Sequence, residues 1–298
     1  MKISTHHVEQ PLVSVIVPAY NAVKYIKATI ESALEQTYRN LEVVVGDDGS
    51  TDGTREIVQA LAARDPRVKY FSQKNAGQSA ARNLAIAHAQ GKYIAFLDAD
   101  DLFLPTKLEE QVGYLEAHPD CGVSYCNIYH FFDGDPTHLY RFDVPTPSGL
   151  LFDKLLRANF INPLTVVLRK ELLDRYGAFE PTFRRVDEQH LWLKLSWNGA
   201  QFCHLPRALG RYRVHRASLS NEPVYFKESE EQFLKLIEIM RRDWFKPGDA
   251  EKYHLDEIVA RTKRRLWVGK ILASKDPLSR LLLKLYYWKR MRRMLPVG

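Results

Sequence analysis

The chain has 298 residues, of which 45% are hydrophobic and 27% charged, a composition typical of a globular protein that argues against disorder. Its 43 lysines and arginines exceed its 36 acidic residues, and the formal net charge of +7 favours an anionic partner: nucleic acid, a phospholipid surface or a phosphorylated substrate. The N-terminus lacks the apolar core of a signal peptide, and no run approaches the roughly 20 apolar residues that cross a bilayer, so we expect a cytoplasmic protein.

The three cysteines, Cys121, Cys126 and Cys203, are odd in number and show no C-x-x-C spacing. Such a set predicts neither a disulfide framework nor a zinc site. We therefore expect reduced thiols, in keeping with a cytoplasmic protein.

Short apolar runs rich in β-branched and aromatic residues occupy the N-terminal third of the chain. They are predicted as buried strands at 14–17, 41–45, 68–71 and 93–97. Helical patterns separate them, at 21–36, 52–63 and 78–89. Because strands and helices alternate, the sequence predicts a parallel sheet with right-handed crossovers.

The alternation becomes irregular further along. A helix is predicted from Pro105 to residue 118 and a strand at 123–129. Segment 133–149, rich in Pro, Gly and Asp, is predicted as a long connection that could cover a site. The remaining predicted elements are strands at 165–168 and 209–214, a helix at 187–197, and long charged helices beyond residue 220. We expect a leader at 1–11, one α/β domain at 12–220 and a basic helical region at 221–298.

Acidic and amide side chains gather where the predicted strands end. The first strand ends in Pro18-Ala19-Tyr20-Asn21, the second in Asp47-Asp48-Gly49-Ser50 and the fourth in Asp98-Ala99-Asp100-Asp101. Open α/β sheets bind ligands at the carboxyl ends of their strands. An Asp-x-Asp ending presents two carboxylates that suit Mg²⁺ or Mn²⁺, which would neutralise a departing diphosphate, although such aspartates also cap helices.

The segments VSVIVPAYN, LEVVVGDDGSTDGT, NAGQSAARN and GKYIAFLDADD together resemble glycosyltransferase family 2, of the GT-A fold. These motifs agree with the family in type, order and approximate spacing, and the likeness covers residues 12–220. The resemblance implies a Rossmann-like α/β fold with a mixed, mainly parallel sheet flanked by helices, here with a C-terminal helical extension. It implies an inverting enzyme that transfers a sugar from a nucleotide diphosphate donor.

By this resemblance, the first strand and the Asp-Asp pair hold the nucleotide base and ribose. Pro18, Tyr20, Asp47 and Asp48 would line that pocket. A carboxylate there could accept the imide N–H of uracil, which favours a UDP-sugar, although thymidine and guanosine donors also carry an N–H. Arg82, in NAGQSAARN, would lie near the donor and bind phosphate or the carboxylates of the second strand, with a purely structural ion pair as the alternative.

In the Asp-x-Asp motif, the resemblance makes Asp100 the direct ligand of Mn²⁺ or Mg²⁺ and Asp98 a residue near the ribose or the metal. Asp101 would support them or cap the next helix. The later segment RYRVHRAS resembles a family segment in which an arginine and a histidine approach the diphosphate or the metal. This indicates Arg213 for a phosphate oxygen and His215 for the metal, with a structural histidine as the alternative.

Sugar transfer needs a base for the acceptor proton, which typically contributes about 10²- to 10⁴-fold to the rate. The stretch DEQHLWLKLS resembles the family's Glu-Asp-x-x-x-Trp helix when aligned on Trp192. Glu188 then takes the position of the usual catalytic aspartate, with the acidic order inverted, and Asp187 is the alternative base. Both acids could instead serve only to favour the positive end of a helix dipole.

Segment 278–294 interleaves leucine and aromatic residues with lysine and arginine, so it could lie on the inner face of an anionic membrane or pack on the catalytic domain. We expect a glycan or lipid-linked saccharide as acceptor, in surface polysaccharide synthesis, with its pocket within 133–163 and no nucleic acid partner.

A nucleotidyltransferase would need a glycine-rich basic loop that the N-terminus lacks. The alternative function is not enzymatic. It is a module that binds a membrane or a nucleic acid through the basic C-terminal tail.

Overall fold

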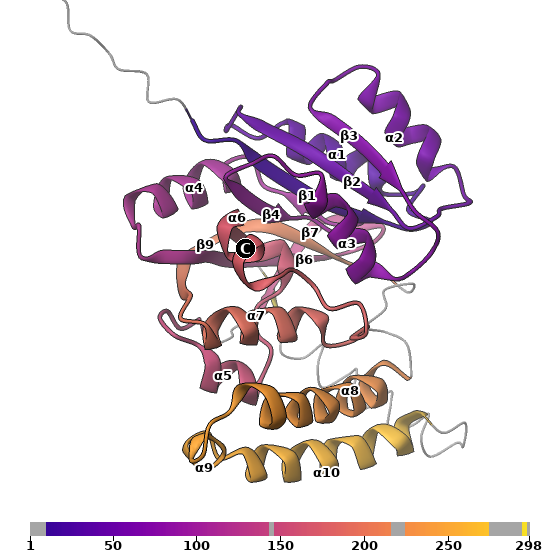
Figure 1. The fold of residues 1–298 in the computed structure, drawn as a ribbon. Coiled ribbons are helices and arrows are strands. Elements are labelled where there is room, and N and C mark those ends of the chain that lie inside the picture. The colour runs from indigo at the N-terminus through magenta and orange to yellow at the C-terminus, as the bar shows by residue number, and fades with distance from the viewer. Residues whose placement is uncertain (1–9, 143–145, 216–223, 274–293, 297–298) are drawn as a thin grey trace, which may run out of the picture.

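The structure of the protein is a computed structural model that describes residues 10–142, 146–215, 224–273 and 294–296. One twisted sheet carries helices on both faces, and the last helices form a further layer at one end of the molecule (Figure 1). The predicted α/β architecture, a mixed sheet flanked by helices with a C-terminal helical extension, is confirmed.

Parallel strands form one half of the sheet, in the order β4-β1-β2-β3. They are β1 (Val13–Ala19), β2 (Leu41–Asp47), β3 (Val68–Ser72) and β4 (Tyr93–Phe96), and each overlaps a predicted strand. Side chains alternate between two cores, so that Val15 and Val17 of β1 point to one and Ile16 to the other. Strands β1, β2 and β4 are buried along their whole length, which explains their mainly apolar sequences, whereas β3 at the edge of the sheet is partly exposed.

The other half of the sheet is mixed. Its strands are β5 (Leu102–Phe103), β6 (Cys121–Phe132), β7 (Asp135–Phe142), β8 (Val166–Arg169), β9 (Gln201–Val214) and β10 (Met294–Pro296). β8 pairs antiparallel with β4 and β6, and β9 runs parallel to β6 and antiparallel to β5. Because β5 directly follows the aspartates after β4, its pairing with β9 brings the segment that ends at His215 to those aspartates.

Helices pack against two hydrophobic cores, one on each face of the sheet. The first core includes side chains of α1 (Ile26–Leu34), α2 (Thr54–Ala62) and α4 (Lys107–Ala117). The second includes side chains of α3 (Gln78–Ala87), α5 (Phe152–Arg157), α6 (Lys170–Tyr176) and α7 (Asp187–Trp197). The 3₁₀ turn η1 (Pro163–Thr165) leads into β8.

The C-terminal helices share the second core. They are α8 (Tyr225–Ile239), the π-helical turn η3 (Met240–Trp244), α9 (Asp249–Lys252) and α10 (Leu255–Ala273). Phe233 of α8 and Ile258 of α10 belong to the same buried cluster as Trp192 of α7. Within the described ranges, every helix falls short of the length and apolar character that a membrane crossing needs. The predicted domain boundary near residue 220 and the predicted membrane segment 278–294 lie outside the described residues, apart from Met294.

Segment 133–149 contains a strand where the sequence analysis expected a long connection. β6 and β7 form an antiparallel hairpin whose turn is Asp133-Gly134, with Gly134 at a φ of 93°. Asp-Gly is a strong signal for such a two-residue turn. The residues that suggested a loop therefore make a tight turn and the start of an added strand.

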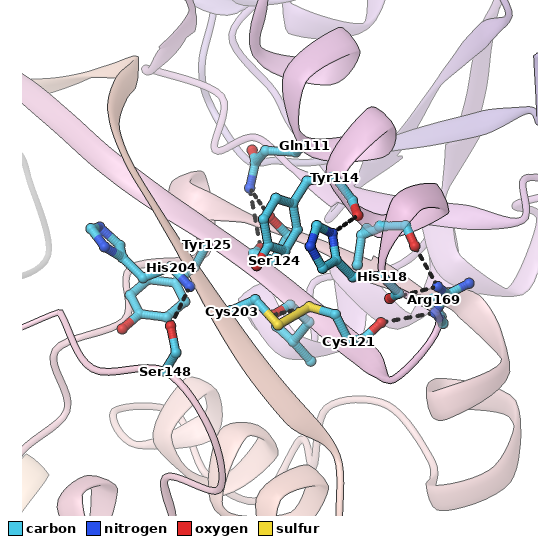
Figure 2. Close-up of a disulfide and its surroundings, with 12 residues drawn as sticks. Gln111, Tyr114, His118, Cys121, Ser124, Tyr125, Ser148, Arg169, Cys203 and His204 are labelled. Atoms are coloured by element: carbon cyan, nitrogen blue, oxygen red, sulfur yellow. Dashed lines mark hydrogen bonds between the residues drawn. A yellow bond between two sulfur atoms is a disulfide. The ribbon is translucent and has the colours of Figure 1, made fainter.

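Two of the three cysteines are joined, which corrects the expectation of reduced thiols. Cys121 of β6 and Cys203 of β9 form a disulfide with their Cα atoms 6.2 Å apart, and Cys126 is a buried free thiol. Figure 2 shows the bond between the two strands, with Arg169 donating a hydrogen bond to the carbonyl oxygen of Cys121. The two cysteines are 82 positions apart, so only the pairing of β6 with β9 brings them within bridging distance.

A glycine in β2 allows α3 to approach the sheet closely. A Cβ atom on Gly46 would lie 2.2 Å from the carbonyl oxygen of Ala81 in α3. We expect Gly46→Ala to lower the free energy of unfolding by about 1–3 kcal/mol, because helix and strand must separate. Urea unfolding measures the change. Gly113→Ala is the control, since Gly113 of α4 has nothing within 4 Å of an added Cβ, and alanine there should stabilise by about 0.5–1 kcal/mol. Equal unfolding midpoints for the two variants would contradict the packing argument.

Candidate active site

A large cleft follows the carboxyl ends of the parallel strands and continues to the C-terminal helices. Its volume is about 1480 Å³, above the roughly 300–1,000 Å³ of a pocket for one small molecule. Its wall includes residues 18–22, 48, 75–79, 98–100 and 184–189, and further residues of α5, α8 and α10. The cleft therefore has room for more than one small molecule.

The two adjacent aspartates after β2 have different surroundings. Asp48 lines the cleft and holds the next loop, accepting hydrogen bonds from the N–H groups of Ala76 at 2.9 Å and Gly77 at 2.8 Å. Asp47 is fully buried and accepts a hydrogen bond from the hydroxyl of Ser50 at 2.6 Å. Of the predicted pair, Asp48 lies on the cleft wall and Asp47 shapes the loop behind it.

Pro18 and Tyr20, predicted to line the base pocket, both lie on the cleft wall. Tyr20 is 53% exposed, so it is open to a ligand. Asn21 ties this strand end to the neighbouring loop, because its Oδ1 accepts a hydrogen bond from the N–H of Thr51 at 2.9 Å. The structure thus brings the ends of β1 and β2 together on one side of the cleft.

Arg82 of α3 is completely buried among three carboxylates. Its guanidinium group lies 2.9 Å from Asp98, 3.1 Å from Glu188 and 3.2 Å from Asp187. These carboxylates follow β4 and begin α7, whereas the predicted partners were the carboxylates after β2. Arg82 therefore connects the Asp-x-Asp motif to the two acids predicted as bases.

The two acids at the start of α7 differ in their exposure. Asp187 is 5% exposed, and its Oδ2 accepts a hydrogen bond from the hydroxyl of Ser79 at 2.7 Å as well as from Arg82. The side chain of Glu188 is 26% exposed and lines the cleft. Burial, opposed by Arg82 and assisted by the charges of Asp187 and Asp98, raises the pKa of Glu188 to about 8. Of the two carboxylates, Glu188 is the one more open to a substrate.

Asp100 and His215 meet on the cleft wall, where Nε2 of His215 lies 2.7 Å from Oδ2 of Asp100. Asp101 points inward and accepts a hydrogen bond from the backbone N–H of Arg213 at 2.8 Å. Burial, together with the charges of Asp100 and Asp98, raises the pKa of Asp101 well above its usual range. The Nε of Arg213 donates to the carbonyl oxygen of Asp100 at 2.8 Å. Arg213 thus lies behind the Asp100–His215 pair, and its contact with a phosphate oxygen stays a prediction.

The Asp100–His215 pair has part of the ligand set of a divalent cation. A carboxylate oxygen and an imidazole nitrogen suit Mn²⁺, and carboxylates suit Mg²⁺. Asp98, the other predicted ligand, accepts hydrogen bonds from Arg82 at 2.9 Å and from Gln78 at 3.3 Å. In the part of the chain that the structure describes, no group of three His, Cys, Asp or Glu side chains is arranged to hold a metal ion. The residues therefore fit a cation whose remaining ligands are substrate phosphates and water.

Two residues of NAGQSAARN contact the site without having been identified from the sequence. Gln78 donates a hydrogen bond to Asp98, and Ser79 donates one to Asp187. They precede Arg82 by four and three positions on α3, so all three share one face of the helix. A helical projection of the motif is the signal that could have identified them.

The fold and the site together indicate an α/β enzyme. Its acidic side chains and Arg82 lie at the carboxyl ends of the strands, along a cleft that is wide enough for two substrates. The model of the family described as Glycosyl transferase family 2 matches residues 14–189, more than half of the chain. The chain belongs to glycosyltransferase family 2, and the resemblance noted in its motifs is confirmed.

Curated proteins that are similar to this chain are also named as glycosyltransferases. TuaG of Bacillus subtilis (strain 168), named as a teichuronic acid biosynthesis glycosyltransferase, is 34% identical over 238 residues, which cover 80% of this chain and 92% of that protein. WfaP of Escherichia coli, named as a UDP-Glc:alpha-D-GlcNAc-diphosphoundecaprenol beta-1,3-glucosyltransferase, is 35% identical over 212 residues, or 70% of this chain and 80% of that protein.

Solved structures show the same fold. TarS of S. aureus in complex with UDP superposes with a TM-score of 0.62 at 22% identity, covering 88% of this chain and 81% of that chain. The mannosyltransferase PcManGT of Pyrobaculum calidifontis, in complex with GDP-Man and Mn²⁺, gives a TM-score of 0.60 at 22% identity, covering 95% and 81%. At such identities the likeness concerns the fold alone, and it confirms the predicted GT-A architecture.

Proposed function

We propose that this glycosyltransferase moves a sugar from a UDP-sugar to a hydroxyl group of a glycan or lipid-linked saccharide, with inversion at the anomeric carbon, in surface polysaccharide synthesis. The observation that carries the proposal is that Asp48, the Asp100–His215 pair and Glu188 open onto one cleft. The relatives support these substrates, because WfaP is named for UDP-Glc and a diphosphoundecaprenol-linked acceptor and TarS was solved with UDP and with UDP-GlcNAc.

The uridine would lie between the ends of β1 and β2. Tyr20 presents an exposed ring to the base, and Pro18 lies on the same wall. Asp48 accepts three hydrogen bonds from the protein, so one of the roughly four acceptor positions of a carboxylate remains for the imide N–H of uracil. Asp47 would act indirectly by holding the loop of Ser50.

Mn²⁺ or Mg²⁺, when bound, would neutralise charge on the diphosphate leaving group. Asp100 and His215 are the residues that would hold it, and Asp98 would support the metal or the ribose. Arg213 is proposed as a positioning residue, because it donates to the backbone of Asp100 and to Asp101.

Glu188 is proposed as the base. Its carboxylate would accept the proton of the acceptor hydroxyl while that oxygen bonds to the anomeric carbon and the bond to the diphosphate breaks. Arg82 lowers the pKa of Glu188 from the value that burial alone would give, and it directs the carboxylate through a contact of 3.1 Å. Asp187 would hold Arg82 and Ser79 in place.

We propose that the reaction takes place at a membrane surface, since the acceptor named for WfaP is attached to a lipid. The basic and aromatic residues of 278–294 are the proposed membrane contact. This segment lies outside the described residues, so the proposal depends on its sequence.

Calorimetric titration with UDP, GDP, dTDP and CMP, with and without Mn²⁺, tests the donor site. We expect UDP with Mn²⁺ to bind most tightly, and Asp100→Asn to weaken that binding about tenfold or more, as losses around metal sites commonly do. Asp120→Asn is the control, because Asp120 is an exposed aspartate in the turn after α4. If no nucleotide binds in any condition, the donor-site interpretation fails and the basic C-terminal segment becomes the functional candidate.

A further inference from the structure

The cleft continues beyond Glu188 to a wall that carries three arginines. Arg157 lies at the end of α5, and Arg261 and Arg265 lie one turn apart on α10. Figure 1 places α10 beyond α8, at the opposite end of the molecule from β1–β3. We call these three residues the arginine wall. None of the donor-site residues belongs to it, so it can serve the second substrate.

Two of the three side chains of the arginine wall form direct ion pairs with carboxylates. Arg265 pairs with Glu230 at 2.6 Å, and Arg157 pairs with Asp153 at 3.0 Å. Arg261 donates to the backbone carbonyl oxygen of Arg157 at 2.5 Å, and its buried Nε makes no hydrogen bond within the described residues. One guanidinium group of the three thus lacks a carboxylate partner among those residues.

The surroundings of Arg261 favour an added anion. Burial and the nearby charges of Arg265 and Arg157 lower the pKa of Arg261, while Glu230 opposes them. Positive groups that repel one another in a partly desolvated position are stabilised when an anion enters between them.

We infer that the arginine wall binds the phosphate or diphosphate group of the glycosyl acceptor, so that the acceptor hydroxyl reaches Glu188 in the same cleft. The planar fork of arginine matches phosphate oxygens and forms paired, charge-assisted hydrogen bonds with them. Phe160 and Phe233 also line the cleft and offer it apolar surface. This inference rests on the proposed function, because it assigns the acceptor of that reaction.

The test compares butyl compounds that share a chain and differ in head group. Butyl diphosphate, butyl glucuronide and butyl glucoside are titrated calorimetrically into the full chain with its donor site saturated by UDP. We expect butyl diphosphate to bind, and Arg261→Gln to weaken its binding about tenfold or more, since one charge-assisted hydrogen bond contributes at least that factor. Butyl glucoside should bind wild type and variant equally weakly.

Arg264→Gln is the matched control, because Arg264 is exposed on the same helix and lies off the cleft wall. Butyl diphosphate binding that is equal in Arg261→Gln and Arg264→Gln would overturn the inference. Tighter binding of butyl glucuronide would also overturn it, because the ligand would then be a carboxylate.

UDP binding should be unchanged in both variants. If wild type binds no UDP, the proposed function fails; if UDP binds and Arg261 makes no difference, only this inference fails. Should Arg261→Gln not fold, Arg157→Gln replaces it, because that side chain is 40% exposed.

Discussion

Replacing Glu188 by glutamine is expected to lower kcat for sugar transfer by about 10²- to 10⁴-fold, the usual contribution of a general base. Glutamine keeps the size of the side chain and can still contact Arg82, but it cannot accept the acceptor proton. Binding of UDP should stay close to that of wild type, because Asp48 and the Asp100–His215 pair are unchanged. Steady-state kinetics with the acceptor, together with UDP titration, measures both quantities.

Asp187→Asn is the control for this assignment. Asp187 is nearly buried and bound to Ser79 and Arg82, so its loss should disturb the position of Arg82 and reduce kcat less than Glu188→Gln. A larger loss for Asp187→Asn, with Glu188→Gln nearly active, would reverse the two roles.

The pH dependence provides a second readout for Glu188. A base must be deprotonated to act, and a pKa of about 8 means that Glu188 is mostly protonated at neutral pH. We expect kcat/KM of wild type to rise with pH and to level off above about 8, since this ratio reports the ionisation of the free enzyme. The residual activity of Glu188→Gln should lack that rise.

Arg82→Met is expected to lower the free energy of unfolding by about 3–5 kcal/mol, because it leaves buried carboxylates without their cation. Asp98, Asp187 and Glu188 all lie within 3.2 Å of the guanidinium group in the native protein. Urea unfolding monitored by circular dichroism measures the change. The substitution should also change the pH dependence of kcat/KM. Because Arg82 lowers the pKa of Glu188, the rise of kcat/KM should move to higher pH in the variant.

Arg39→Met is the matched control, because Arg39 is exposed and its loss should change stability by no more than about 0.5 kcal/mol. In the double variant Arg82→Met with Asp187→Asn, one carboxylate fewer is left unpaired, so part of the stability should return. An Arg82→Met protein as stable as wild type would show that the three carboxylates are neutralised without Arg82.

The sequence predicted much of the donor edge because its signals are local. Buried parallel strands are continuous apolar runs, and the residues that follow them must meet at one edge of the sheet. These local signals predicted Tyr20, Asp48 and Asp100 at the edge of the sheet where the cleft lies. The Asp133-Gly134 turn was equally local and readable, but the surrounding composition led to the prediction of a loop.

Other features depended on which segments become neighbours. Asp47 and Asp48 look equivalent in the sequence, yet only one faces the cleft, because side chains alternate along a strand and its exit. Arg82 could be assigned partners only when α7 was seen to pack beside α3.

The sequence by itself determined the family, through the resemblance of its motifs, and the core strands with the acidic motifs that follow them, because motifs, hydrophobic periodicity and strand ends are properties of consecutive residues. Only the tertiary structure decided the Cys121–Cys203 bond, the position of Arg213 behind Asp100 and the arginine wall. Each of these depends on contacts between segments far apart in the chain, and the free energy of such contacts is set by packing, which no local pattern records.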